Sequence, residues 1–227
     1  MAAVAATRLT SPCDGCDARC CRSYTVHVTG ADAYRIASGL GLEMVRFLGY
    51  VAEVERSETG FLLEAGGPTF SIILETARTG EPRRPCLFFR VDPATGEGRC
   101  GIYPLRPDAC RRFPAYRRDD GGIAAREEVV CPDGAWVGHP MDRLSWRVAL
   151  AREERERELY AVVVAEWNAR VEAERGRPAR TVERYLDHLS DAYGWITRMR
   201  HALPPRESAG PGLLVRVGEA LREFPGR

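Results

Sequence analysis

The sequence predicts an α+β fold, in which a small region of short strands and helices comes before an α-helical region. Two observations support this prediction. All eight cysteines lie between Cys13 and Cys131, among short apolar runs separated by turn-forming residues. From Met141 onward cysteine is absent, and apolar residues recur at helical spacing between charged ones. We therefore expect a cysteine-rich domain at residues 1–140 and a helical region at residues 141–227.

The first elements follow from local signals. Apolar residues alternate over residues 24–28, which predicts a strand. Thr29 stands three residues before Asp32, the spacing of a capping box, so a helix is expected to begin there and end at Gly41. The apolar pattern of residues 42–50 predicts a second short helix.

The middle of the cysteine-rich part predicts strands and turns. Residues 60–74 hold two apolar runs separated by a glycine and proline turn. Residues 85–103 predict a β-hairpin with Cys86 and Cys100 on its two arms. Pro107 fits the start of a short helix that carries Cys110.

The last part of the chain predicts three helices. The first runs from about 141 to 176, where a following proline prevents continuation. Thr181 is the expected N-cap of the second, which ends before two prolines at 204 and 205. The third covers residues 213–224.

Composition excludes several functions. Lys and Arg total 33 against 32 Asp and Glu, and all 33 are Arg, so no lysine Schiff base can form. A net charge of +1 predicts neither a nucleic-acid partner nor a membrane partner. The first twelve residues lack a signal-peptide pattern, which predicts a cytoplasmic protein. Thiols stay reduced there, so we favour metal ligation over disulfides or a thioredoxin-like pair.

Four cysteines stand within nine residues, as CxxCxxxCC, in a polar segment. They are Cys13, Cys16, Cys20 and Cys21. Short cysteine spacings suit both zinc and iron–sulfur centres. Adjacent side chains diverge by about 100° on a helix, so Cys20 and Cys21 are not expected to chelate one tetrahedral ion together. Two separate sites and one polynuclear centre both remain open.

The other four cysteines are expected to join this centre. They are Cys86, Cys100, Cys110 and Cys131. Arginines close to the cysteines, Arg106 and Arg111 among them, would offset thiolate charge from around the ligands, and Tyr103 would help to exclude water. His139 is the best candidate for an extra ligand among the histidines.

These motifs resemble the YkgJ-type cysteine-cluster family, which is described as zinc- or iron-chelating. The similar segments are Cys13–Cys21, Val26–Leu48, Pro85–Phe88 and Arg99–Pro114, and the resemblance covers about Cys13 to Cys131. It implies that the cysteines are ligands and that Arg106, Pro107 and Phe113 occupy framework positions. It implies no particular reaction.

Two functions are compatible with the sequence. The favoured one is an iron protein, most simply iron–sulfur, in redox chemistry or modification of another molecule. The alternative is a zinc-stabilised module without catalysis, whose carboxy-terminal helices bind a protein partner. Metal storage or delivery is a third possibility. Neither composition nor motifs reveal a substrate.

Overall fold

The computed structural model describes residues 16–77, 84–126, 129–132, 135, 143–203 and 211–223. Its helices and strands confirm the α+β prediction. In chain order they are α1 (Arg19–Ser23), α2 (Gly30–Leu40), η1 (Met44–Arg46), β1 (Leu48–Ala52), β2 (Phe61–Leu62), β3 (Thr69–Leu74), β4 (Phe89–Val91), β5 (Gly98–Cys100), η2 (Tyr103–Leu105), α3 (Asp108–Arg112), β6 (Ala115–Arg117), β7 (Ile123–Ala125), α4 (Arg143–Ala173), α5 (Val182–Ala202) and α6 (Pro211–Glu223).

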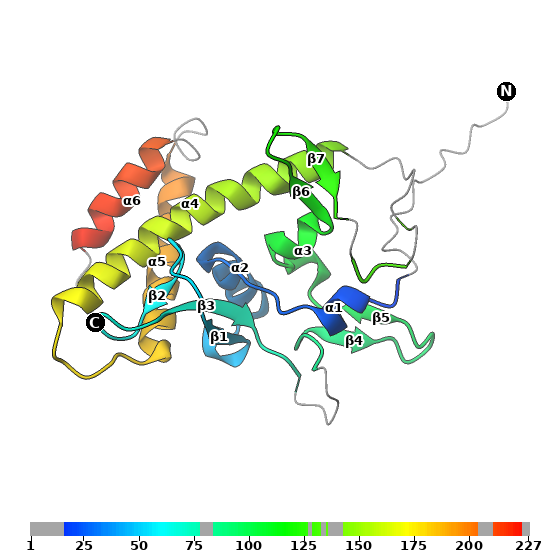
Figure 1. Cartoon of the computed structure of the whole chain (residues 1–227), viewed down its shortest axis with the longest axis horizontal. Helices are drawn as coiled ribbons and strands as arrows, with labels where there is room; N and C mark the ends of the chain where they lie inside the picture. The colour runs from blue at the N-terminus through cyan, green and yellow to red at the C-terminus, as the bar shows by residue number, and fades with distance from the viewer. Residues whose placement is uncertain are drawn as a thin grey trace.

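The long helix α4 organises the molecule. It packs against α3, α5, α6 and β2, so it contacts both halves of the chain. Figure 1 shows the short elements α1, β4, β5 and α3 grouped toward one end of the molecule and α5 and α6 at the other. The predicted boundary between residues 140 and 141 lies outside the described residues, and the division into two domains stays a prediction.

The strands form three small antiparallel sheets. In the largest, β3 lies between β1 and β2, with Leu48 opposite Leu74 and Phe61 opposite Phe70. The pairs β4–β5 and β6–β7 are hairpins. The expected hairpin at 85–103 is therefore confirmed, although Cys86 precedes β4 and pairs with Thr76 in an isolated bridge.

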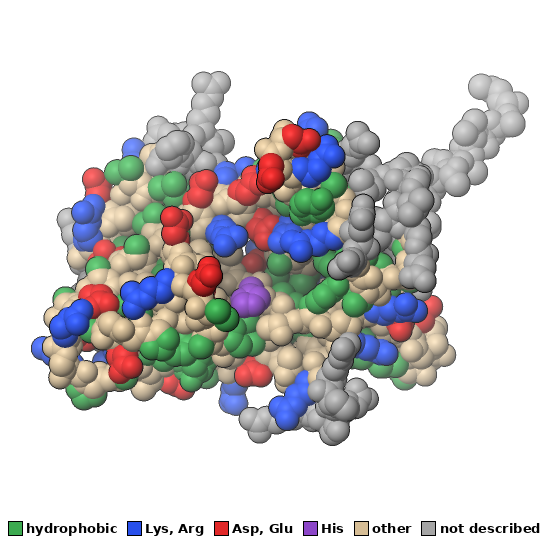
Figure 2. All heavy atoms as spheres, in the orientation of Figure 1, with side chains coloured by type: hydrophobic (Ala, Val, Ile, Leu, Met, Phe, Trp, Pro, Cys, Tyr) green, Lys and Arg blue, Asp and Glu red, His purple; other side chains and the backbone are tan. Residues whose placement is uncertain are grey.

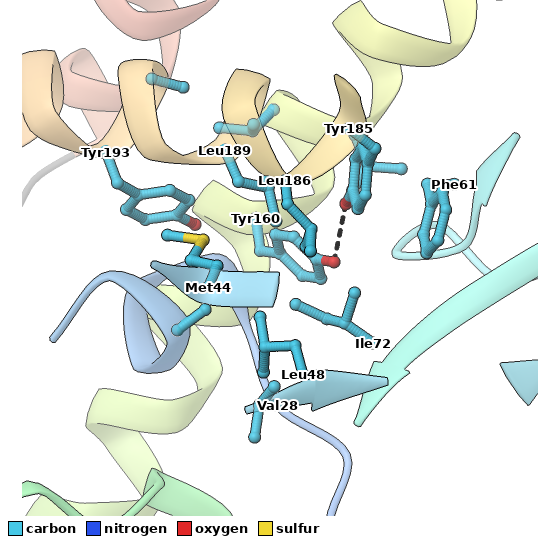
Figure 3. Packing of buried hydrophobic residues seen from close by; sticks show 14 of the residues in the cluster. Val28, Met44, Leu48, Phe61, Ile72, Tyr160, Tyr185, Leu186, Leu189 and Tyr193 are labelled. Carbon is cyan, nitrogen blue, oxygen red and sulfur yellow. Dashed lines mark hydrogen bonds between the residues drawn. The ribbon is translucent and has the colours of Figure 1, made fainter. Parts of the chain in front are cut away.

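One hydrophobic core joins the early elements to the carboxy-terminal helices. Its buried members include Ile36 of α2, Phe47, Ile72 of β3, Val163 of α4 and Ile196 of α5. In Figure 3 the side chains of α4 and α5 face Leu48 of β1, Phe61 of β2 and Ile72 of β3. The hydroxyls of Tyr160 and Tyr185 lie 2.8 Å apart. This hydrogen bond gives both buried hydroxyls a partner inside the apolar core.

The helix boundaries follow the predicted caps. The hydroxyl of Thr29 accepts a hydrogen bond from the backbone N–H of Asp32, and the carboxylate of Asp32 accepts one from the backbone N–H of Thr29. These two bonds form the expected capping box of α2. Gly41 ends this helix in the left-handed conformation, with φ 63°. The hydroxyl of Thr181 accepts the backbone N–H of Arg184 at the start of α5.

Two predicted elements differ in the structure. The helix expected over residues 42–50 is only the 3₁₀ turn η1, because Leu48 begins strand β1 and pairs with β3. The strand expected over residues 24–28 is extended but contributes an isolated bridge, His27 to Ile73. None of the described helices is both long enough and apolar enough to span a membrane.

Candidate metal centre

Six cysteines border one cavity of about 1180 Å³. They are Cys16, Cys20, Cys21, Cys86, Cys100 and Cys110. All six are free thiols, five of them half-buried and Cys86 buried. The fold therefore brings together three segments, which are the motif from Cys16 to Cys21, the hairpin region with Cys86 and Cys100, and helix α3 with Cys110.

Backbone contacts hold the first two segments against each other. Cys20 and Cys21 lie on α1, which follows Ala18 in the left-handed conformation, with φ 56°. The backbone N–H of Cys86 donates to the carbonyl of Cys21 at 2.7 Å. A side chain at Gly98, two residues before Cys100 in strand β5, would place its Cβ 2.4 Å from the carbonyl oxygen of Asp17. Glycine is therefore required where β5 approaches the cysteine motif.

Cys110 belongs to the third segment, helix α3, and this helix takes its cap from elsewhere in the chain. Pro107 precedes it and gives no side-chain cap. The carboxylate of Asp32 instead accepts the backbone N–H of Asp108 at 3.0 Å, across 76 residues. The same Asp32 completes the capping box of α2, so one buried side chain holds the amino-terminal ends of two helices.

The loop that leads into α3 is held by arginines. Arg35 and Arg111 both donate to the carbonyl of Arg106, at 3.1 and 2.9 Å, and Arg111 also donates to the carbonyl of Pro104. Arg111 is therefore directed at the backbone of this loop and does not line the cavity. It supports the loop that leads to the helix with Cys110.

Arg106 and Tyr103, the other two residues predicted to lie around the ligands, line the cavity. The guanidinium of Arg106 lies over the ring of Tyr103, 4.0 Å from its centroid. Within the same cavity wall, Arg112 forms an ion pair with Glu153 of α4. Figure 2 shows arginine and acidic side chains interleaved on the α4 side of this face. The arginines therefore border the cavity with their charges partly balanced.

The thiols influence one another's protonation. The hydrogen bond from Cys21 lowers the pKa of Cys20 to about 7, against burial, with a smaller contribution from Arg106. That same hydrogen bond, with burial, raises the pKa of Cys21. Burial raises the pKa of Cys86, Cys100 and Cys110. Among these five thiols, Cys20 therefore loses its proton most readily, and metal binding by the others would release protons.

Two of the eight predicted cysteine ligands are not among the six that are described on this cavity's wall. Cys13 lies outside the described residues, and so does His139. Cys131 is described and half-buried, but it does not line the cavity. Their ligation stays a prediction.

Sequence reasoning missed the residues that support α3. Asp32 was recognised only as part of a capping box, while Asp108 and the Arg152 side chain of α4 had no predicted role. Asp108 is 1% exposed, and a buried carboxylate needs charged partners. In the sequence the only signal was an aspartate just after Pro107 at the start of a short helix.

The donor chemistry of the cavity fits a soft or borderline metal, because thiolates are the ligands that zinc and iron–sulfur centres prefer. In the described part of the chain, no three His, Cys, Asp or Glu side chains are already arranged around one metal-sized point. The thiols surround a cavity wider than a single ion. Ligation would therefore require their side chains to turn inward.

Thiols gathered from short elements of an α+β fold define a cysteine-cluster protein. Residues 12–132, more than half of the chain, match the CxxCxxCC family, described as "Putative zinc- or iron-chelating domain". The chain belongs to this family, which confirms the resemblance seen in the motifs and supports metal binding in general. The chain has three residues between Cys16 and Cys20, one more than the family's name writes. Comparisons with curated proteins and with solved structures found no match.

Proposed function

We propose that the chain binds iron through its cysteine thiolates, most simply as an iron–sulfur or other polynuclear centre, and uses it in redox chemistry or in modification of another molecule. The observation that carries the proposal is the convergence of six thiols on one cavity. If the chain held two separate four-cysteine zinc sites, the thiols would be expected to form two groups rather than border one cavity.

The adjacent pair supports a centre with more than one metal. Cys20 and Cys21 both lie on α1 and both line the cavity. The two thiols hydrogen-bond to each other, so their sulfurs lie close enough together to ligate neighbouring metal atoms of one centre. Arg106 would offset the negative charge of the thiolates from beside the ligands.

The size of the cavity supports chemistry on a second molecule. Ligand pockets commonly measure about 300–1000 Å³. The cavity of about 1180 Å³ is larger than a metal centre needs, so a small molecule or the side chain of a partner could enter beside it. The proposal places this chemistry in the cytoplasm, where the thiols would stay reduced.

Metal analysis tests the identity of the centre. The chain would be purified with and without oxygen, and its metals and visible absorption measured. The proposal expects stoichiometric iron and sulfide-to-iron charge-transfer absorption in the anaerobic preparation, with loss of both in air. A colourless protein that holds stoichiometric zinc and no iron in both preparations contradicts it.

Single serine replacements of all eight cysteines would identify the ligands. Replacements at Cys20, Cys86, Cys100 and Cys110 are expected to lower the metal content, because these thiols border the cavity. The same measurement tests the predicted ligation by Cys13 and Cys131. An unchanged metal content in every variant would contradict thiolate ligation altogether.

A second candidate function is a zinc-stabilised interaction module. Helix α1 contains no buried residue, so packing alone gives its cysteines little support. Structural zinc contributes folding free energy in such segments. In this version the carboxy-terminal helices would bind a protein partner, and a chelator would abolish binding. Full partner binding by the metal-free chain would contradict it.

A further inference from the structure

Two acidic residues are buried side by side next to the cysteine cavity. Asp32 is 2% exposed and Asp108 is 1% exposed. The carboxylate of Asp32 accepts the backbone N–H of Asp108, at 3.0 Å. The carboxylate of Asp108 accepts no hydrogen bond within the described residues but faces Arg152 at 3.2 Å, Arg111 at 3.6 Å and Arg35 at 3.7 Å.

These contacts determine the position of α3. The helix has only five residues and no side-chain cap of its own, so it has little intrinsic stability. The carboxylate of Asp32 in α2 accepts a hydrogen bond from the first backbone N–H of α3. Arg152 of α4 forms an ion pair with the side chain of Asp108, the first residue of α3. Cys110 lies two residues after Asp108 on this helix, and its thiol borders the cavity. The place of that thiol therefore depends on residues from two other helices.

We propose that Asp32 and Arg152 are positioning residues of the metal centre, which act by holding α3 so that the Cys110 thiol faces the cavity. The expected change in metal affinity rests on the proposed metal binding. The expected exposure of the Cys110 thiol does not. Arg152 lies outside the residues that match the family, so a helix particular to the rest of the chain takes part in the centre.

The alternative is that the same contacts only hold helices together. In that case their loss would lower overall stability and would affect every thiol alike. Cys16 lies on a different segment and provides an internal reference within each variant, because it borders the same cavity.

The first experiment uses the full metal-free chain and iodoacetamide, with peptide mapping of each alkylated thiol. Arg152→Ala is expected to raise the alkylation rate of Cys110 several-fold relative to Cys16, and Arg152→Lys to keep most of the wild-type protection. Arg155→Ala is the matched control, because Arg155 is exposed on the same helix and has no ion pair within the described residues. It is expected to leave the ratio unchanged.

The Asp32 contact has its own pair of variants. Asp32→Ala removes the acceptor for Asp108, whereas Thr29→Val removes a hydroxyl from the same capping box and leaves that acceptor in place. Only Asp32→Ala is expected to raise the Cys110-to-Cys16 ratio. Equal ratios in the two variants would overturn the role of Asp32.

The second experiment measures zinc affinity of the same variants by competition with a chromophoric chelator. Residues that orient metal ligands typically contribute about 10- to 100-fold to affinity. Arg152→Ala is expected to weaken zinc binding on the order of tenfold, and Arg155→Ala to leave it unchanged.

The two readouts separate the two proposals. If the wild-type chain binds no metal but Arg152→Ala still exposes Cys110, metal binding fails and the positioning of Cys110 stands. If the chain binds metal but neither Arg152→Ala nor Asp32→Ala changes Cys110 relative to Cys16 or the affinity, the positioning roles are overturned.

Discussion

Asn168 of α4 pairs with Leu62 of β2 as a neighbouring strand would. The backbone N–H of Leu62 donates to Oδ1 of Asn168 at 2.8 Å, and Nδ2 of Asn168 donates to the carbonyl of Gly60 at 2.9 Å. Beside it, the indole of Trp167 donates to the carbonyl of Leu62 at 2.7 Å. Strand β2 lies at the edge of its sheet, so these side chains satisfy the backbone groups that the sheet leaves open.

Replacing Asn168 with alanine should therefore weaken the link between the sheet and α4. Two backbone groups would lose their partners, and each unsatisfied buried group costs about 1–3 kcal/mol. We expect Asn168→Ala to lower the free energy of unfolding by about 2–3 kcal/mol in urea titrations. Glu158→Ala, on an exposed part of the same helix, serves as control and should change it by less than about 0.5 kcal/mol. Equal effects of the two would contradict the strand-like pairing.

Gly30 is expected to be intolerant of any side chain. It begins α2 and lies under the ring of Tyr193, so a Cβ there would come within 2.1 Å of a ring carbon. Overpacking of this kind typically costs about 1–3 kcal/mol, so Gly30→Ala should lower the midpoint of thermal unfolding. The control is Gly218→Ala in α6, where the nearest atom would be 3.6 Å away. Removing a helical glycine there should stabilise the protein by up to about 1 kcal/mol. A stabilising Gly30→Ala would contradict the close contact with Tyr193.

The sequence predicted elements wherever the determining signal was local. The capping box of Thr29 and Asp32 and the N-cap at Thr181 are examples, because each needs only residues within one turn. The helix expected at residues 42–50 was wrong for the opposite reason. Leu48 to Ala52 become a strand by pairing with β3, about twenty residues later, and an apolar pattern does not reveal such a partner.

The same limit applies to the candidate site. The cysteine spacing predicted metal binding, because packing does not explain four thiols clustered in a polar segment. Cys110 was expected to join the other cysteines, but spacing did not show how it would reach the cavity that Cys20 borders, since this depends on packing between α1, the hairpin and α3. Nor did it show that Asp32 caps α3, because the bond crosses 76 residues. Asp32 looked fully explained by its local role.

Metal removal should affect one end of the molecule more than the other. Helix α1 has no buried residue, whereas α5 has seven, so the elements around the cavity have less packing to hold them without metal. We expect a chelator to speed amide hydrogen exchange at Cys86, whose N–H donates to the carbonyl of Cys21, and to leave α5 protected. Mass spectrometry of peptides before and after chelation would measure this. Uniform loss of protection, or no change, would contradict a locally stabilising metal.

His188 should make the folded protein sensitive to acid. Burial, reinforced by the charge of Arg170, lowers its pKa from the usual 6.5 to about 4. The folded state therefore keeps this ring neutral over a range in which the unfolded chain takes up a proton. Between pH 6.5 and pH 4 the unfolded state binds more protons, so stability falls as the pH falls through this window. The loss attributable to His188 should be at most about 3 kcal/mol.

The variant His188→Gln isolates this contribution, because it keeps a polar side chain but removes the titration. Urea titrations of both proteins at a series of pH values would give the free energy of unfolding. The difference between wild type and variant should change across the window from pH 6.5 to pH 4 and stay constant above it. Parallel curves for wild type and His188→Gln would show that the ring titrates alike in the folded and unfolded states, contrary to its burial against Trp167.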